Sequence, residues 1–162
     1  MDLNEFWQLI EKSRAAGPCE EQAEELGDLL SKKPSQEIIA FDRIFAERLD
    51  EAYRWDLWGV AFIINGGASD DGFEYFRCWL IGQGRDYFEA ALNDPERAAD
   101  KAVPGEEHEC EDLLYAAASA YESVTGSDMA YARGKRPKAP GGEPWDEDDL
   151  DEMYPELIKK FG

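Results

Sequence analysis

The stretch that decides the fold runs from Leu57 to Leu92 with the sequence LWGVAFIINGGASDDGFEYFRCWLIGQGRDYFEAAL. Its first part, Leu57 to Ile64, contains no charged residue. A helix without charge has no face suited to water, so this part must be covered on nearly all sides. The spacing of Trp55, Trp58 and Phe62 (i, i+3, i+7) favours a helix over a buried strand. The pattern therefore predicts a buried helix.

A polar turn separates this helix from a second one. Residues 65–67 (NGG) suit the left-handed conformation that ends a helix. Ser69 is a typical N-cap, because its hydroxyl accepts from a free backbone N–H. Asp70 and Asp71 place negative charge where the helix dipole is positive. The second helix is expected over residues 70–81.

Arg77 is the unusual residue of this second helix. On a helical wheel it falls between Phe73 and Ile81, inside the apolar arc. An arginine cannot lose its charge, so in such a place it must meet a carboxylate, a cluster of carbonyls or an anionic ligand. Asp70 and Asp71 lie about two turns away, roughly 10 Å along the helix. A partner from another helix, or a ligand, is therefore as reasonable as a local carboxylate.

Five polar residues at the helix ends and in the apolar arc form the candidate ligand-binding cluster: Ser69, Asp70, Asp71, Arg77 and Arg85, the last opening a third helix after the GQG turn at 82–84. A helix N-terminus with nearby arginines can hold an anion, and carboxylates beside arginine can hold an amine. Caps and a buried ion pair explain the same residues without any ligand. Both interpretations remain open at this point.

Caps, prolines and apolar stripes predict further helices along the chain. They cover residues 2–17, 19–33, 35–52 leading directly into the central stretch, 95–100, 107–124 and a final helix that starts at Pro155. No segment shows sustained alternation of apolar and polar residues, so no sheet is expected. The predicted fold is all-α, a single compact multi-helix domain over 1–162 with a docked C-terminal helix. Residues 133–144 are expected to form a basic Pro/Gly-rich loop, and 145–162 an acidic segment with the final helix.

The central run GGASDDGFEYFRCWLIGQGRDYFEAAL, together with Phe6-Trp7 and the YPEL segment at 154–157, resembles a bacterial family catalogued as domain of unknown function 4240. The resemblance spans nearly the whole chain, and its central motif is specific. Fusion of some members to a WGR-type domain implies an accessory role. The resemblance implies no catalytic residue.

The chain is strongly acidic. Its 162 residues carry 37 Asp and Glu against 17 Lys and Arg, a formal net charge of −20. Such a charge repels phosphate backbones and anionic headgroups, so neither direct nucleic-acid binding nor membrane binding is expected. Either solubility or a basic protein partner accounts for such a charge.

Three cysteines are present, far apart and odd in number: Cys19, Cys78 and Cys110. With no apolar signal segment at the N-terminus, this pattern predicts reduced thiols and a cytoplasmic location.

Familiar catalytic and cofactor patterns do not fit. His108 and Asp112 have the i, i+4 spacing of metal ligands, but a second histidine or a cysteine at ligand spacing is missing. The acidic neighbours of His108 favour an exposed helix start over a metal site. Ser69 lacks the preceding strand and final glycine of a nucleophile elbow. The GQG turn lacks the third glycine of a dinucleotide fingerprint, and residues 146–152 lack the glycine of a calcium loop. We expect no metal and no cofactor, and we lean against an enzyme.

Trp145 lies outside the helical stripes, between a basic loop and an acidic run, and could anchor the tail or a partner. With Asp146, Asp148 and Asp149 it forms the candidate partner-binding segment. The favoured hypothesis is a non-catalytic binding or accessory protein whose acidic surface meets a basic protein. One alternative is a small enzyme or ligand binder with a pocket at the candidate ligand-binding cluster. Another is an acidic inhibitor, or immunity-type protein, that mimics nucleic acid.

Overall fold

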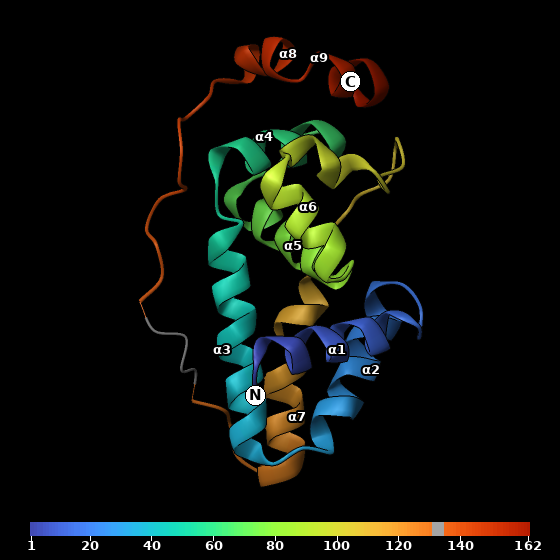
Figure 1. Cartoon of the computed structure of the whole chain (residues 1–162), viewed down its shortest axis with the longest axis vertical. Helices are drawn as coiled ribbons and strands as arrows, with labels where there is room; N and C mark the ends of the chain where they lie inside the picture. Colours follow the sequence, from blue (N-terminus) through green and yellow to red (C-terminus); the bar gives the residue numbers. More distant parts are fainter. Residues whose placement is uncertain (131–134) are drawn as a thin grey trace.

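The computed structural model describes residues 1–130 and 135–162, and the regular elements among them are all helices (Figure 1). In chain order they are α1 (Leu3–Arg14), α2 (Cys19–Ser31), α3 (Ser35–Glu51), α4 (Trp55–Ile64), α5 (Asp70–Gly82), α6 (Arg85–Asn93), the 3-10 helices η1 (Pro95–Ala99) and η2 (Glu111–Leu114), α7 (Ala116–Thr125), η3 (Glu147–Asp149), α8 (Leu150–Met153) and α9 (Pro155–Phe161). The predicted all-α class is confirmed. Residues 133 and 134 of the predicted basic loop lie outside the described residues.

The helices are arranged along one long axis, with α3 running beside two groups (Figure 1). At one end α1 and α2 pack together, and α7 packs against α2 and α3. At the other end lie α4, α5 and α6, and the C-terminal helices cover α4. A continuous apolar core connects both ends, and its largest fully buried side chains include Phe6, Phe41, Phe45, Phe73, Phe76 and Phe88. Leu150, Tyr154 and Leu157 of the C-terminal segment belong to this core, so the predicted docking of the C-terminal helix is confirmed.

Several helices begin where side-chain chemistry predicts. Asp2 accepts a hydrogen bond from the backbone N–H of Glu5 at 2.8 Å, and Ser69 accepts one from Gly72 at 3.1 Å. Each bond satisfies a backbone donor that the first turn of a helix leaves free. Pro155 divides the C-terminal stripe into α8 and α9 and occupies the first turn of α9, where its missing N–H has no cost.

The third predicted helix does not run on into the central stretch. α3 ends at Glu51 and α4 begins at Trp55. Between them the chain pairs with Gly141, which donates to the carbonyl of Tyr53 and accepts from the N–H of Trp55, both at 2.9 Å. Because these backbone groups bond to a distant residue, they cannot continue a helical ladder.

The long helix predicted over 107–124 is wrong in its first half. The chain is irregular up to Cys110, forms η2, and becomes α-helical only in α7. The backbone N–H of His108 bonds to the Asn65 side chain at 2.9 Å, and that of Cys110 bonds to the carbonyl of Tyr75 at 2.9 Å. These bonds tie the segment to α4 and α5, so its own helical hydrogen bonds do not form.

The predicted reduced thiols are also wrong for two of the three cysteines. Cys19, at the start of α2, and Cys110, just before η2, form a disulfide. They are 91 positions apart in the sequence, and only the packing of α2 beside η2 brings them together. The third cysteine, Cys78, is buried in α5.

Candidate functional site

Arg77 lies in the apolar face of α5, as the wheel predicts, with 5% of its surface exposed. Its Nη1 donates to the carbonyl of Leu49 at 2.6 Å. Its guanidinium carbon lies 4.6 Å from the ring centre of Tyr53 and 4.7 Å from that of Phe73. Burial lowers the pKa of Arg77, but its ordinary pKa is so high that the group stays charged. A carbonyl near the end of α3 and two aromatic faces therefore receive the buried charge.

Arg77 also lines a small cavity of about 180 Å³ at the N-terminal end of α5. Asp50, Asp70 and Glu74 bring carboxylates to this cavity, and Arg136 brings a second guanidinium. Asp50 is already paired with Arg136 at 2.6 Å, and Asp70 accepts from the Tyr53 hydroxyl at 3.2 Å. Burial, and then the Asp70 carboxylate, raise the pKa of Tyr53, so this hydroxyl stays protonated and remains a donor at neutral pH.

The structure brings only part of the candidate ligand-binding cluster together. Asp70 and Arg77 line the same cavity, whereas Ser69 caps α5. Asp71 lies exposed in the first turn of the same helix. Arg85 lies beyond the other end of α5, roughly 20 Å away along the helix, where it pairs with Glu89 and Asn4. The length of α5 therefore separates Arg85 from the other four.

Trp145 anchors the C-terminal segment to α4. Its ring stands edge-on to Trp55, Trp58 and Phe62 at 5.6 to 6.4 Å between ring centres, and its indole N–H donates to the carbonyl of Trp55. Gly59 permits this approach, because a Cβ there would lie 3.0 Å from Leu150 and 3.3 Å from the Trp145 nitrogen. The anchoring of the tail, one of the two roles considered for Trp145, is thus seen directly.

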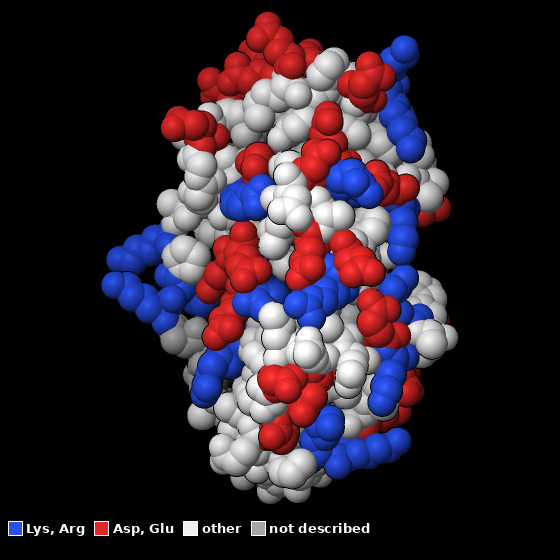
Figure 2. Space-filling model, in the orientation of Figure 1, with Lys and Arg blue, Asp and Glu red and all other residues white. Residues whose placement is uncertain are grey.

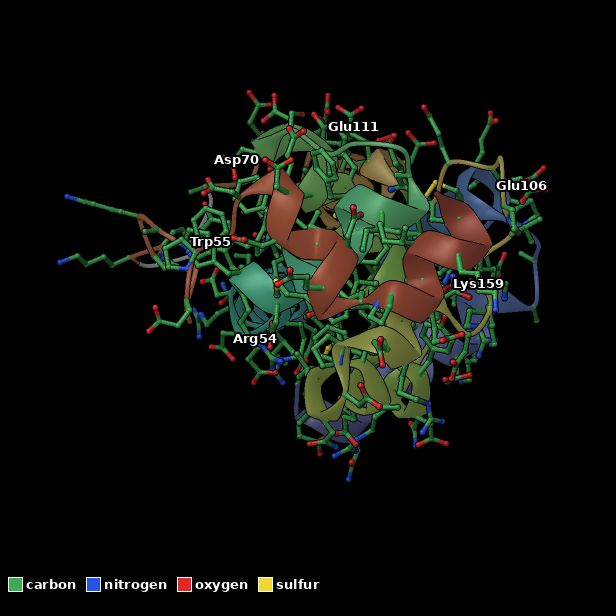
Figure 3. The ribbon with its side chains drawn as sticks, turned by 90° about the horizontal axis from the view of Figure 1, so that it is seen from above. Arg54, Trp55, Asp70, Glu106, Glu111 and Lys159 are labelled. Atoms are coloured by element: carbon green, nitrogen blue, oxygen red, sulfur yellow. A yellow bond between two sulfur atoms is a disulfide. The ribbon has the colours of Figure 1, made fainter. Side chains whose placement is uncertain are left out.

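After Trp145 the chain exposes a run of carboxylates over the end of the molecule. Asp146 caps η3: its backbone N–H donates to Asp149 at 2.9 Å. The exposed acids of this run are Asp146, Glu147, Asp148, Asp149, Asp151 and Glu152. Figure 2 shows acidic side chains gathered at this end. Figure 3, seen from above, shows the C-terminal helices lying on top of α4. Among the ion pairs between described residues, none involves these acids.

A cavity of about 350 Å³ opens within this acidic end. It is lined by Trp145 and Met153, with Pro144, and by the carboxylates of Glu143, Asp149 and Glu152. Met153 is 41% exposed, so its apolar side chain is open to a partner. We call residues 143–153 the acidic docking segment. An apolar floor surrounded by exposed carboxylates suits a long cationic side chain.

The histidine at 108 is not a surface residue, contrary to the exposed helix start that its acidic neighbours suggested. It is 5% exposed, and its ring contacts Trp79. Within the described ranges, 1–130 and 135–162, no three His, Cys, Asp or Glu side chains are grouped in a way that could hold a metal ion. No helix in those ranges is both long and apolar enough to cross a membrane.

Residues 1–123 match the family described as protein of unknown function DUF4240, and because this is more than half of the chain, the protein belongs to that family. The match confirms the resemblance carried by the central run. It ends within α7, so the acidic docking segment and the YPEL segment lie beyond the matched residues. No curated protein and no solved structure matches the chain.

Proposed function

We propose that this member of the DUF4240 family is a non-catalytic binding or accessory protein, and that its acidic docking segment holds a basic stretch of a protein partner. The observation that carries the proposal is the cavity where Glu143, Asp149 and Glu152 surround an apolar floor of Trp145 and Met153. The docking segment lies beyond the residues matched to the family. The proposal therefore applies to this chain and not to the family as a whole.

A lysine or arginine side chain fits this cavity chemically. Its methylene stem can lie along Met153 and Pro144, while its charge meets the surrounding carboxylates. The face of Trp145 can add a cation–π contact, which is worth about 0.5 to 2 kcal/mol depending on how far water is excluded. Trp145 is held by three aromatic neighbours and a hydrogen bond, so little ordering is required when a partner binds.

The charge of the whole chain supports the same partner class. A net charge of −20 attracts cationic proteins over long distances and speeds their encounter. Salt screens exposed charges over about 8 Å at physiological ionic strength. Binding through this segment is therefore expected to weaken steeply as salt is raised.

The test is quantitative affinity capture with a charge-neutralised segment, Glu143→Gln/Asp148→Asn/Glu152→Gln, which leaves the Asp146 and Asp149 cap intact. A matched control, Glu5→Gln/Glu21→Gln/Glu122→Gln, removes the same charge from exposed positions on α1, α2 and α7. We expect basic proteins to be retained by the parent and the control, lost with the segment variant, and released by moderate salt. If no protein is lost specifically with the segment variant, the proposal is wrong.

The identity of a captured partner also separates this proposal from nucleic-acid mimicry. A mimic would retain nucleic-acid-binding proteins, and added DNA would displace them by competing for the same basic surface. An accessory protein would keep its partner when DNA is added, unless the basic stretch of that partner itself binds DNA.

The cavity at Arg77 is a weaker candidate for a ligand site. Its volume of about 180 Å³ is below the range of about 300 to 1,000 Å³ that is usual for small-molecule sites. Arg77 also has partners inside the protein, namely the Leu49 carbonyl and the rings of Tyr53 and Phe73. A structural role for Arg77 accounts for these contacts, and the docking segment is therefore the preferred site.

The cytoplasmic location that we expect no longer has the support of three reduced thiols. A disulfide such as Cys19–Cys110 is more common in oxidising compartments. The proposed partner class depends on charge and shape alone, and it holds for either location.

A further inference from the structure

A second concave surface lies between α1 and the segment formed by α6 and η1. This groove has a volume of about 900 Å³ and is lined from three parts of the chain. α1 contributes Lys12 and Arg14, α6 contributes Arg85, and the region of η1 contributes Arg97 and Lys101. In Figure 2, basic side chains alternate with acidic ones across the middle of the visible face. We call it the basic groove.

The charge of the basic groove is opposite to that of the chain. Five cations line it, against the three carboxylates of Glu11, Asp86 and Asp100. In the whole chain, 37 acidic residues outnumber 17 basic ones. A local excess of positive charge inside a concave surface attracts anions even when the rest of the protein repels them.

The groove's ion pairs do not explain this concentration of cations. Arg14 pairs with Glu11 at 3.0 Å, Arg85 with Glu89 at 3.0 Å and Arg97 with Asp100 at 2.8 Å. Each pair joins residues three or four positions apart, so none of them holds α1 to α6 across the groove. Such exposed local pairs contribute little to stability. The arginines in these exposed pairs therefore remain able to contact a ligand.

With the three arginines of the groove in local pairs, Lys12 and Lys101 supply its remaining positive charge, against the carboxylate of Asp86. Among the ion pairs between described residues, none involves either of them. The Lys101 ammonium lies 5.1 Å from the ring centre of Tyr87. The Tyr87 hydroxyl donates to the carbonyl of Ala98 and accepts from the N–H of Lys101. Burial raises the pKa of Tyr87 to about 12, so the hydroxyl stays neutral and keeps Lys101 at the groove.

The N-terminus of α6 faces the same groove. Gly84 supplies no side-chain cap, and Gln83, Arg85 and Asp86 of this helix start line the groove. The first N–H groups of a helix are unsatisfied donors at the positive end of its dipole, which is a suitable place for an anion. Glu11 comes close to this point, because its Oε1 lies within 1.9 Å of where a Cβ at Gly84 would stand. The Glu11 carboxylate therefore lies beside the helix start, and a phosphate bound there would displace it.

From these observations we infer that the basic groove binds a small metabolite through a dianionic phosphate ester. The cations of the groove suit a phosphate monoester, which carries up to two negative charges near neutral pH. The volume of about 900 Å³ exceeds what phosphate alone would fill, and it lies within the range of small-molecule sites. The amide of Gln8 also lines the groove, beside those of Asn4, which accepts from Arg85, and Gln83, which donates to the carbonyl of Trp79. The groove lies wholly within the residues matched to the family and on a different surface from the acidic docking segment.

The test is an NMR titration of the backbone amides with inorganic phosphate and with AMP, at constant ionic strength kept by chloride, with adenosine as the uncharged counterpart of AMP. We expect saturable shifts at residues 8–14, 83–87 and 97–101 with both phosphate probes and none of comparable size with adenosine. If neither phosphate probe produces saturable shifts there, or if adenosine produces the same ones, the inference is wrong.

Charge variants locate the binding. Lys12→Gln/Lys101→Gln is expected to raise the Kd for AMP by about tenfold or more, because two cations near the phosphate are lost. The control Lys159→Gln/Lys160→Gln removes the same charge from exposed residues of α9 and should leave the Kd nearly unchanged. Equal weakening in both variants would mean that only the net charge matters, which contradicts a built site. Neither outcome affects the affinity-capture test of the docking segment.

Discussion

His108 connects two parts of the structure through both of its ring nitrogens. The N–H of Val103 donates to Nε2 at 3.0 Å, so Nε2 must be an acceptor. Nδ1, which lies 3.2 Å from the side-chain oxygen of Asn65, then carries the proton and donates it. The same Asn65 bonds to the backbone N–H and carbonyl of His108. Neutral histidine fits this arrangement, and protonation of Nε2 would break the bond from Val103.

We therefore predict that His108 makes stability depend on pH. Burial lowers the pKa of His108 below its ordinary value of 6.5, and Glu106 opposes this shift only partly. The unfolded chain then binds the proton more readily than the folded protein, so stability is full above about pH 6.5 and falls as pH decreases. Urea unfolding across this range should show the loss for the parent and a flatter profile for His108→Gln. At neutral pH that variant should be less stable by about 1 kcal/mol. Parallel profiles for the two proteins would contradict the assignment.

At the residue scale, the sequence predicted that Arg77 is buried but left its partner open. The helical wheel uses only the residues of α5, whereas the Leu49 carbonyl belongs to α3, 28 positions earlier. His108 shows the same limit more strongly, because its acidic neighbours suggested an exposed helix start. Its burial depends on Asn65, 43 positions away.

At the scale of elements, α4 and the C-terminal segment depend on each other through Gly59. A Cβ at this position would lie 3.0 Å from Leu150, 3.2 Å from Tyr154 and 3.3 Å from Trp145. These three side chains hold the tail on α4, and the Tyr154 hydroxyl adds a hydrogen bond to the carbonyl of Asp56 at 3.0 Å. The absence of a side chain at Gly59 is therefore part of the tail's docking site.

We predict that Gly59→Ala lowers the free energy of unfolding by about 1 to 3 kcal/mol, because the new methyl group overpacks this contact. The tail should also be cleaved faster in limited proteolysis. Gly27→Ala in α2 is the control, since its Cβ would meet only the carbonyl of Ala116 at 3.9 Å. Without a clash, alanine in a helix should be neutral or stabilising by up to about 1 kcal/mol. Equal stability of the two variants would show that the tail tolerates the added methyl.

At this scale the helices of the first half, 2–17 and 19–33, could be predicted well, because caps, prolines and apolar stripes act within a few residues. The segment from Glu107 to Cys110 could not, because its backbone hydrogen bonds go to α4 and α5 and not to its own neighbours. Local helix signals do not include that competition.

At the scale of the whole molecule, the Cys19–Cys110 disulfide joins residues that are 91 positions apart in the sequence. Linking distant residues restricts the unfolded state, and bonds over such loops typically stabilise proteins by about 2 to 4 kcal/mol. The bond joins α2 to the segment before η2, next to His108. It should therefore hold that segment in place as well as stabilise the fold.

We predict that a reducing agent lowers the urea midpoint of the parent protein. The variant Cys19→Ala/Cys110→Ala should already be less stable and should not respond to the reducing agent. A thiol titration of the unfolded, unreduced parent should detect one thiol, that of Cys78, out of three cysteines. Detection of three thiols in protein purified under oxidising conditions would contradict the disulfide.

The sequence by itself determined the helical class, most helix ends, the buried position of Arg77, the division of the tail at Pro155 and the acidic character of the chain. These features depend on the residues within a few positions or on composition alone. Only the tertiary structure decided the Cys19–Cys110 bond, the partners of Arg77 and His108, the separation of Arg85 from the other candidate residues, and the gathering of five cations in one groove. Each of these depends on how distant helices pack, and no local pattern contains that information.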